Sequence, residues 1–217
     1  MMPINRPTPR GKAAVAAAIV AAGITGWAAF TGSHLTPAKP TMTPALIHQA
    51  LDQGVTPPAV FAAIGVIKKW EGLRTAAYLD MVGVPTICYG ETLIDGKPVK
   101  LGMTRTVAAC ETMLIDRVKR DYYLPLVDGV KDFVKAPDSV QGAMISLGYN
   151  IGAAGARTSS SAKDISRYDY KAACEDLSKW NRAGGRAVQG LTNRRGMGDP
   201  GRVGEGELCV SGLAGVQ

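Results

Sequence analysis

Apolar residues divide the chain into one uniform stretch and two helical stripes. Residues 13–30 run for eighteen positions without a charged side chain. The two stripes are spaced by three and four residues: Val60, Ile64 and Ile67, and later Val140, Met144, Leu147 and Ile151. Such steps place side chains on one face of a helix. The pattern therefore predicts an N-terminal apolar helix and two amphipathic helices that line a core.

The first amphipathic helix is expected to end at a carboxylate. Thr56 suits an N-cap, and Pro57 fits the first turn. Glu71 follows Ile67 by four residues, so it continues the apolar stripe and should lose contact with water. A desolvated carboxylic acid keeps its proton to higher pH, as a general acid requires. The alternative is that Glu71 only ends the helix or pairs with Arg74.

A β-hairpin is predicted directly after this helix. Residues 75–79 and 85–90 suit two short strands separated by a glycine-containing turn. The hairpin would bring Asp80 and Thr86 to one edge of a cleft facing Glu71. Asp80, open to water, should stay ionised. Two carboxylates in unlike environments are typical of glycosidases.

The identities of these residues resemble the catalytic signature of phage-type lysozymes, the endolysins of glycoside hydrolase family 24. That signature is Glu, eight residues, Asp, five residues and Thr, which Glu71, Asp80 and Thr86 match. The resemblance extends to residues 147–152 and 180–195, and covers roughly residues 60–212. It implies an α+β, lysozyme-like fold with a small β-hairpin lobe and a mainly α-helical lobe.

The resemblance also implies a function. The chain would be an endolysin that hydrolyses the β-1,4 bond between N-acetylmuramic acid and N-acetylglucosamine in bacterial peptidoglycan, without cofactor or metal. Glu71 would donate the proton, while Asp80 and Thr86 would hold the attacking water or stabilise the transition state. Candidate substrate-binding residues are Tyr89, Tyr149, Asn150 and Arg194. Alternatives are a lytic transglycosylase, which needs only the glutamate, and a membrane-tethered wall-binding protein with a dead site.

Two features depart from the family's pattern. Glu91 stands where family members commonly have His, which puts a third carboxylate near the cleft rim. Residues 196–206 contain five glycines and one proline, where similar endolysins continue an unbroken helix. Glycine and proline disfavour helix interiors. The final helix is therefore expected to be interrupted.

The N-terminal apolar stretch predicts a weak membrane anchor. As a helix, residues 13–30 would be about 27 Å long, against a bilayer core of about 30 Å. Their strongly apolar side chains contribute only about −2 kcal/mol to insertion. Arg6, Arg10 and Lys12 would remain in the cytoplasm. A signal peptide cleaved after Ala29 and an alanine-rich buried helix are alternatives. The resemblance favours a signal-anchor-release segment, held in the host inner membrane and later released to the periplasm.

These elements divide the chain into three parts. We expect residues 1–32 to form the basic N-terminus and anchor, 33–56 a linker with a short helix, and 57–217 the catalytic domain. The formal net charge is +7, which suits a polyanionic target such as cell-wall polymer. Nucleic-acid motifs are absent from the sequence, so we expect peptidoglycan and membrane as partners, no nucleic acid, and a monomer.

Four cysteines, an even number, favour disulfides in an exported protein. They are Cys88, Cys110, Cys174 and Cys209. Three connectivities are possible. Cys88 with Cys110 and Cys174 with Cys209 is favoured because each bridge then stays within one lobe. Four reduced, buried cysteines are the alternative.

Overall fold

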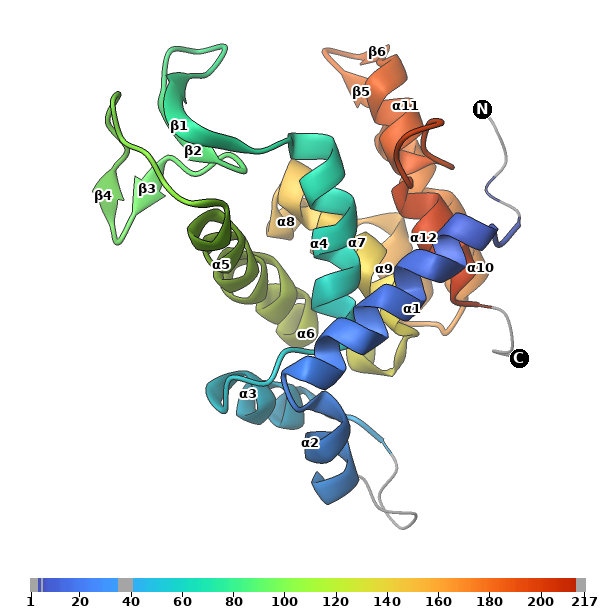
Figure 1. The fold of residues 1–217 in the computed structure, drawn as a ribbon. Coiled ribbons are helices and arrows are strands. Elements are labelled where there is room, and N and C mark those ends of the chain that lie inside the picture. The colour runs from blue at the N-terminus through green and yellow to red at the C-terminus, as the bar shows by residue number, and fades with distance from the viewer. Residues whose placement is uncertain (1–3, 5, 35–40, 214–217) are drawn as a thin grey trace.

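The computed structural model describes residues 4, 6–34 and 41–213. Helices dominate these residues, and the strands form three separate two-stranded hairpins (Figure 1). The helices are α1 (Pro9–Ile24), α2 (Trp27–His34), α3 (Pro44–Asp52), α4 (Pro58–Glu71), α5 (Val107–Arg117), α6 (Leu124–Gly129), α7 (Asp138–Ile151), α8 (Ala153–Thr158), α9 (Ser160–Ile165), α10 (Tyr170–Asp176), α11 (Gln189–Arg195) and α12 (Glu205–Ser211). The strands are β1 (Arg74–Leu79), β2 (Pro85–Cys88), β3 (Leu93–Ile94), β4 (Lys97–Pro98), β5 (Arg182–Ala183) and β6 (Arg186–Ala187).

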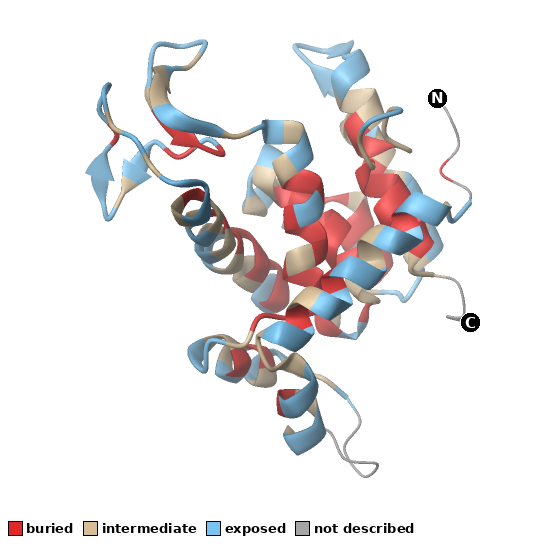
Figure 2. Cartoon of the chain, in the orientation of Figure 1, coloured by how far each residue is buried: buried red, intermediate tan, exposed pale blue. Residues whose placement is uncertain are grey.

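Helix α7 forms the centre of the helical lobe, and its predicted stripe is buried except for Ile151, which is partly exposed (Figure 2). It packs most extensively against α4 and α12. Gly142 allows the closest approach, because a Cβ there would lie 2.8 Å from the Ala62 Cβ of α4. Small residues on both helices thus bring their backbones together and fix the direction of α4, which ends at Glu71.

The hairpin lobe begins three residues after α4. Strands β1 and β2 pair antiparallel, with Tyr78 opposite Thr86, and Gly83 takes φ 80° in the turn between them. The predicted hairpin is confirmed, although it starts one residue earlier than expected, at Arg74, and β2 ends at Cys88. The predicted N-cap of α4 was wrong by one residue, since Pro57 occupies that position and Thr56 is buried.

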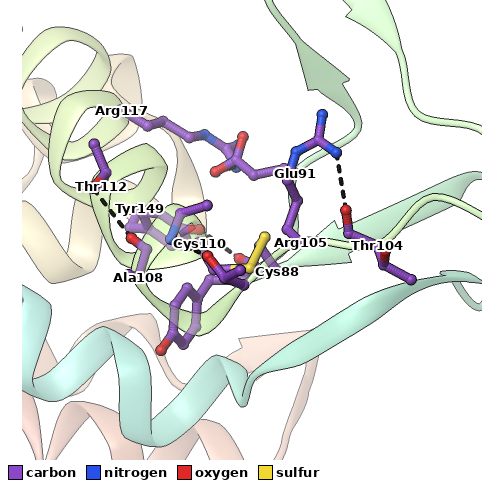
Figure 3. The surroundings of a disulfide bond; sticks show 12 residues. Cys88, Glu91, Thr104, Arg105, Ala108, Cys110, Thr112, Arg117 and Tyr149 are labelled. Carbon is purple, nitrogen blue, oxygen red and sulfur yellow. Dashed lines mark hydrogen bonds and ion pairs between the residues drawn. A yellow bond between two sulfur atoms is a disulfide. The ribbon is translucent and has the colours of Figure 1, made fainter.

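Both favoured disulfides are present. Cys88–Cys110 joins the end of β2 to α5 (Figure 3), and Cys174–Cys209 joins α10 to α12. Each bridge therefore stays within one lobe, as predicted.

The helix after the hairpin lobe continues beyond the end of α5. The Thr106 hydroxyl caps α5 by accepting a hydrogen bond from the Ala109 amide. A π-helical segment, Val118–Tyr123, leads into α6, which ends at Gly129. Pro125 lies in the first turn of α6, which directly follows the π-helical segment; because proline has no N–H to donate, the regular hydrogen-bond pattern is interrupted there. Residues 107–129 thus form one long, irregular rod.

The apolar N-terminal stretch is not one helix but two. Helices α1 and α2 meet at a bend of 76°, and neither is by itself long and apolar enough to cross a membrane; together they pass that test by length and composition. Gly26 takes φ 88° at the bend. The Thr25 hydroxyl accepts a hydrogen bond from the Thr56 amide at 3.0 Å. The expectation of a continuous helix over residues 13–30 is corrected by this corner.

Helix α1 lies against α4 and α12, with Ala18 and Ala22 buried in the contact. At its start, Arg10 forms a two-pronged ion pair with Glu207 of α12 at 2.8 Å for both contacts. Arg10 also donates to the carbonyls of Met197 and Asp199. Thr8 donates a third hydrogen bond to Glu207, which is fully buried. The N-terminal segment is thus part of the folded domain.

The short linker helix was correctly anticipated. Helix α3 is capped by the Thr43 hydroxyl, which accepts from the amide of Leu46, and α3 packs against α6. Helix α2 continues to His34, two residues beyond the expected end of the anchor. The part of the linker at residues 35–40 lies outside the described residues.

Candidate active site

Glu71 is the last residue of α4, and Gly72 follows it with φ 74°. This turn directs the chain away from the helix and into β1. The Glu71 side chain is 27% exposed. The expectation that it continues the buried stripe and loses contact with water is therefore wrong. The apolar stripe ends at Ile67 because the helix emerges from the core one turn later. Exposure places the carboxylate where a substrate can reach it.

Arg194 and Arg195, adjacent on α11, form a charged cluster with Glu71 and Glu205, in which Arg194 contacts Glu71. Arg194 Nη1 lies 2.6 Å from Glu71 Oε1, and the Arg194 side chain is only 6% exposed. Its Nε contacts Glu205 Oε1 at 3.3 Å. Arg195 binds both oxygens of Glu205, at 2.6 and 2.5 Å. The sequence identified Arg194, but it gave no sign that Glu205 would complete the cluster.

The glycine-rich loop between α11 and α12 covers the last turn of α4. Trp70 Nε1 donates to the Val203 carbonyl at 2.9 Å, and the Arg202 guanidinium stacks 3.8 Å from the centroid of the Trp70 indole. The expected interruption of the final helix is confirmed, since α11 ends at Arg195 and α12 begins at Glu205. The loop fixes the residue next to Glu71.

Asp80 directly follows β1 and holds the hairpin turn. Its Oδ1 accepts hydrogen bonds from the amides of Val82 and Val84, at 2.9 and 2.8 Å. These two bonds fix the orientation of the carboxylate, which remains partly exposed. Thr86 is 4% exposed, and its hydroxyl donates to the Val84 carbonyl at 3.0 Å. The Asp80 amide donates to the same Val84 carbonyl at 3.0 Å, so Asp80 and Thr86 lie next to each other at the start of β2.

Tyr149, near the end of α7, connects the two lobes. Its hydroxyl donates to the Tyr89 carbonyl at 2.6 Å, and its ring lies 5.2 Å from the Arg117 guanidinium. Burial raises the pKa of Tyr149; Arg117 opposes this, while the charges of Glu91 and Glu71 add to it. Tyr149 therefore lies within electrostatic range of both carboxylates.

Glu91 points toward Arg117 rather than standing free (Figure 3). The two side chains form an ion pair at 3.1 Å, and Glu91 is 8% exposed. The carboxylate that departs from the family's pattern is thus neutralised by α5. Tyr89 is also buried, and what it offers to the surroundings is the carbonyl that binds Tyr149. We therefore assign Tyr89 a packing role.

Asn150 is exposed at the end of α7 and accepts a hydrogen bond from Arg195. The structure thus brings Glu71, Arg194 and Asn150 into one connected network, with Arg195 and Glu205 at its centre. Within the described residues, no group of three His, Cys, Asp or Glu side chains is arranged to hold a metal ion.

Comparisons with known proteins agree on one family. The family model described as phage lysozyme matches residues 68–197. The SAR-endolysin of Bacteriophage PS119 is 38% identical over 144 residues, which are 65% of this chain and 77% of that protein. The SAR-endolysin of Enterobacteria phage P21 is 36% identical over the same length, 78% of its own chain. The solved endolysin from Escherichia coli O157:H7 phage FAHEc1 superposes with a TM-score of 0.58 and 32% identity, covering 68% of this chain and 89% of that one.

Proposed function

This chain belongs to the phage lysozyme family, and we propose that Glu71, Asp80 and Thr86 carry out its glycoside hydrolysis. The enzyme is an endolysin, and its substrate is peptidoglycan, in which it cleaves the β-1,4 bond after N-acetylmuramic acid. The observation that carries the assignment is the ion pair between Glu71 and the buried Arg194. It holds an exposed carboxylate at the junction of the hairpin lobe and the helical lobe.

Each residue has a distinct role in this mechanism. Glu71 donates a proton to the glycosidic oxygen, so that the sugar leaves as an alcohol rather than an alkoxide. Asp80, oriented by the amides of the turn, stabilises the positive charge that develops on the sugar or activates water. We assign to Thr86, which lies beside Asp80 in the hairpin, the orientation of that water. Asn150 and Tyr149, on α7, border the substrate.

A glutamine variant of the acid tests the assignment. Glu71→Gln keeps the shape of the side chain but cannot donate a carboxylic proton, so hydrolysis should fall by at least about 10². The measurement is the release of reducing ends from purified peptidoglycan, which also separates hydrolysis from formation of an anhydro sugar. Glu111→Gln is the matched control. Glu111 lies on α5 and pairs with Lys68 of α4, so this variant also replaces a glutamate that is bound to a cation and should keep its activity. An active Glu71→Gln enzyme would refute the assignment.

We further infer that residues 1–32 anchor the chain in the host inner membrane, with the N-terminus in the cytoplasm, before releasing the domain to the periplasm. Ile19, Val20 and Ile24 remain exposed on α1, as expected for a helix that also contacts lipid. The ion pair of Arg10 with the buried Glu207 argues against cleavage after Ala29. Cleavage would remove Arg10 and leave a buried carboxylate without its cation. The mass of the released protein tests this directly.

A further inference from the structure

The buried carboxylate of Glu205 contacts Arg195 and also Arg194, the arginine that holds Glu71. Glu205 is fully buried and accepts from Arg195 at 2.6 Å, from the Ser146 hydroxyl at 2.8 Å and from Arg194 Nε at 3.3 Å. Arg194 therefore lies between two carboxylates, one exposed and one enclosed. Its remaining Nη2 is buried with no hydrogen-bond partner among the described residues.

This arrangement matters whenever Glu71 carries a proton. Neutral Glu71 no longer balances the charge of Arg194, and a buried cation without a counter-charge is strongly unfavourable. Glu205 is held by Arg195 and Ser146 whatever the state of Glu71. Its charge remains available to Arg194 through the Nε contact. When the acid is protonated, Arg194 and Arg195 therefore share the single negative charge of Glu205, and Arg194 keeps one anionic partner.

We propose that Glu205 is a positioning residue for the reaction, which retains Arg194 while Glu71 holds the proton that it donates. This inference rests on the proposed role of Glu71 as the acid. Without the Glu205 charge, protonation of Glu71 would leave Arg194 with no anionic partner among the described residues.

The charged and titratable groups around the cluster come from four helices. Helix α11 supplies Arg194 and Arg195, α12 supplies Glu205, α4 supplies Glu71, and α7 supplies the Tyr149 phenol. The neighbouring groups are already paired within their own contacts: Lys68 with Glu111, Arg117 with Glu91, Arg202 with Asp199, and Arg10 with Glu207. Lys69, on the last turn of α4, is exposed. Glu205 is therefore the second anion that contacts Arg194.

The test is the pH–rate profile of the full chain, purified after release and assayed on isolated peptidoglycan. The alkaline limb reports the group that must be protonated. Glu205→Gln should move that limb to lower pH by about 1 pH unit, so that activity falls about tenfold at the alkaline end and little at the acidic end. Glu207→Gln is the control, since it is equally buried on α12 but pairs with Arg10. It should leave the limb in place.

A second variant should move the alkaline limb in the opposite direction, and it still tests the inference if Glu205→Gln does not fold. Ser146→Ala removes a hydrogen bond from the Glu205 carboxylate, which strengthens its hold on Arg194 and should move the limb up by about 0.3 pH unit. Circular dichroism establishes that each variant is folded. Should Glu205→Gln not fold, Ser146→Ala alone decides.

Three results overturn the inference: an unmoved limb in Glu205→Gln, an equal shift in Glu207→Gln, or no upward shift in Ser146→Ala. They leave the proposed function standing as long as Glu71→Gln remains inactive. Activity in Glu71→Gln would instead refute the proposed function itself.

Discussion

Replacing Gly26 by alanine should shift the N-terminal segment from the folded domain toward the membrane. Gly26 takes φ 88° at the corner between α1 and α2. A side chain in this left-handed region costs about 1 kcal/mol. An added Cβ meets no atom within 4 Å, so the penalty comes from the backbone alone. In a continuous membrane helix the same substitution removes a glycine from the interior, which gains about 1 kcal/mol.

The two effects act in the same direction. Together they favour the straight helix over the bent, docked one by about 2 kcal/mol, or roughly 30-fold. The proposed insertion energy of the segment is itself only about −2 kcal/mol, so the change is large on this scale. The membrane potential is expected to help hold so weak a segment in the bilayer. The assay is therefore cell fractionation before and after collapse of that potential, together with the time at which the culture lyses. Gly26→Ala should leave more protein in the membrane and delay lysis.

Gly23→Ala is the matched control. Gly23 lies inside α1, and a Cβ there also meets no atom within 4 Å. It adds the same methyl group but sits in a helix in both states, so the balance should not change. Equal partitioning of the two variants would refute the reasoning, because it would show that the bend at Gly26 does not separate the two forms.

Three predictions concern stability. Burial raises the pKa of Asp138 to about 6, above its usual value of about 3.9. Folding therefore takes up protons between about pH 3.9 and about pH 6. The free energy of unfolding should fall by up to about 3 kcal/mol as pH rises through that window. Asp138→Asn should remove this dependence, melting like the parent at pH 4 and above it at pH 7.5. Removing the Cys174–Cys209 bridge should lower the free energy of unfolding by about 3–4 kcal/mol in denaturant titrations, and it should not raise the enzymatic activity. Gly142→Ala should destabilise by about 1–3 kcal/mol because α4 and α7 must separate, whereas Gly65→Ala, which meets no atom, should stabilise by about 1 kcal/mol.

Local patterns were sufficient for the elements that carry the proposed catalytic residues. The stripe ending at Ile67 placed Glu71 at the end of α4, and the turn at Gly83 placed Asp80 beside Thr86 on one hairpin. Helix and strand periods are properties of neighbouring residues, so they can be read from a single sequence. The glycines after Arg195 predicted the interrupted final helix for the same reason.

Contacts between distant segments could not be read in this way. Arg194 contacts Glu71, which lies 123 positions away in the sequence. Arg195 binds Glu205, which follows the glycine-rich loop. The periodicity placed Glu71 on the apolar stripe, but where the helix emerges from the core depends on what packs beside it. No local pattern shows which faces will meet.

The same division applies to the N-terminus. An uncharged run of eighteen residues is enough to indicate a segment that can enter a membrane. The corner at Gly26, the hydrogen bond of Thr25 to Thr56 and the pairing of Arg10 with Glu207 exist only once that segment is folded against the domain. The composition of the N-terminal segment sets its affinity for lipid. The competing state is the segment packed on a surface that α4 and α12 form together. Only the tertiary structure creates that surface.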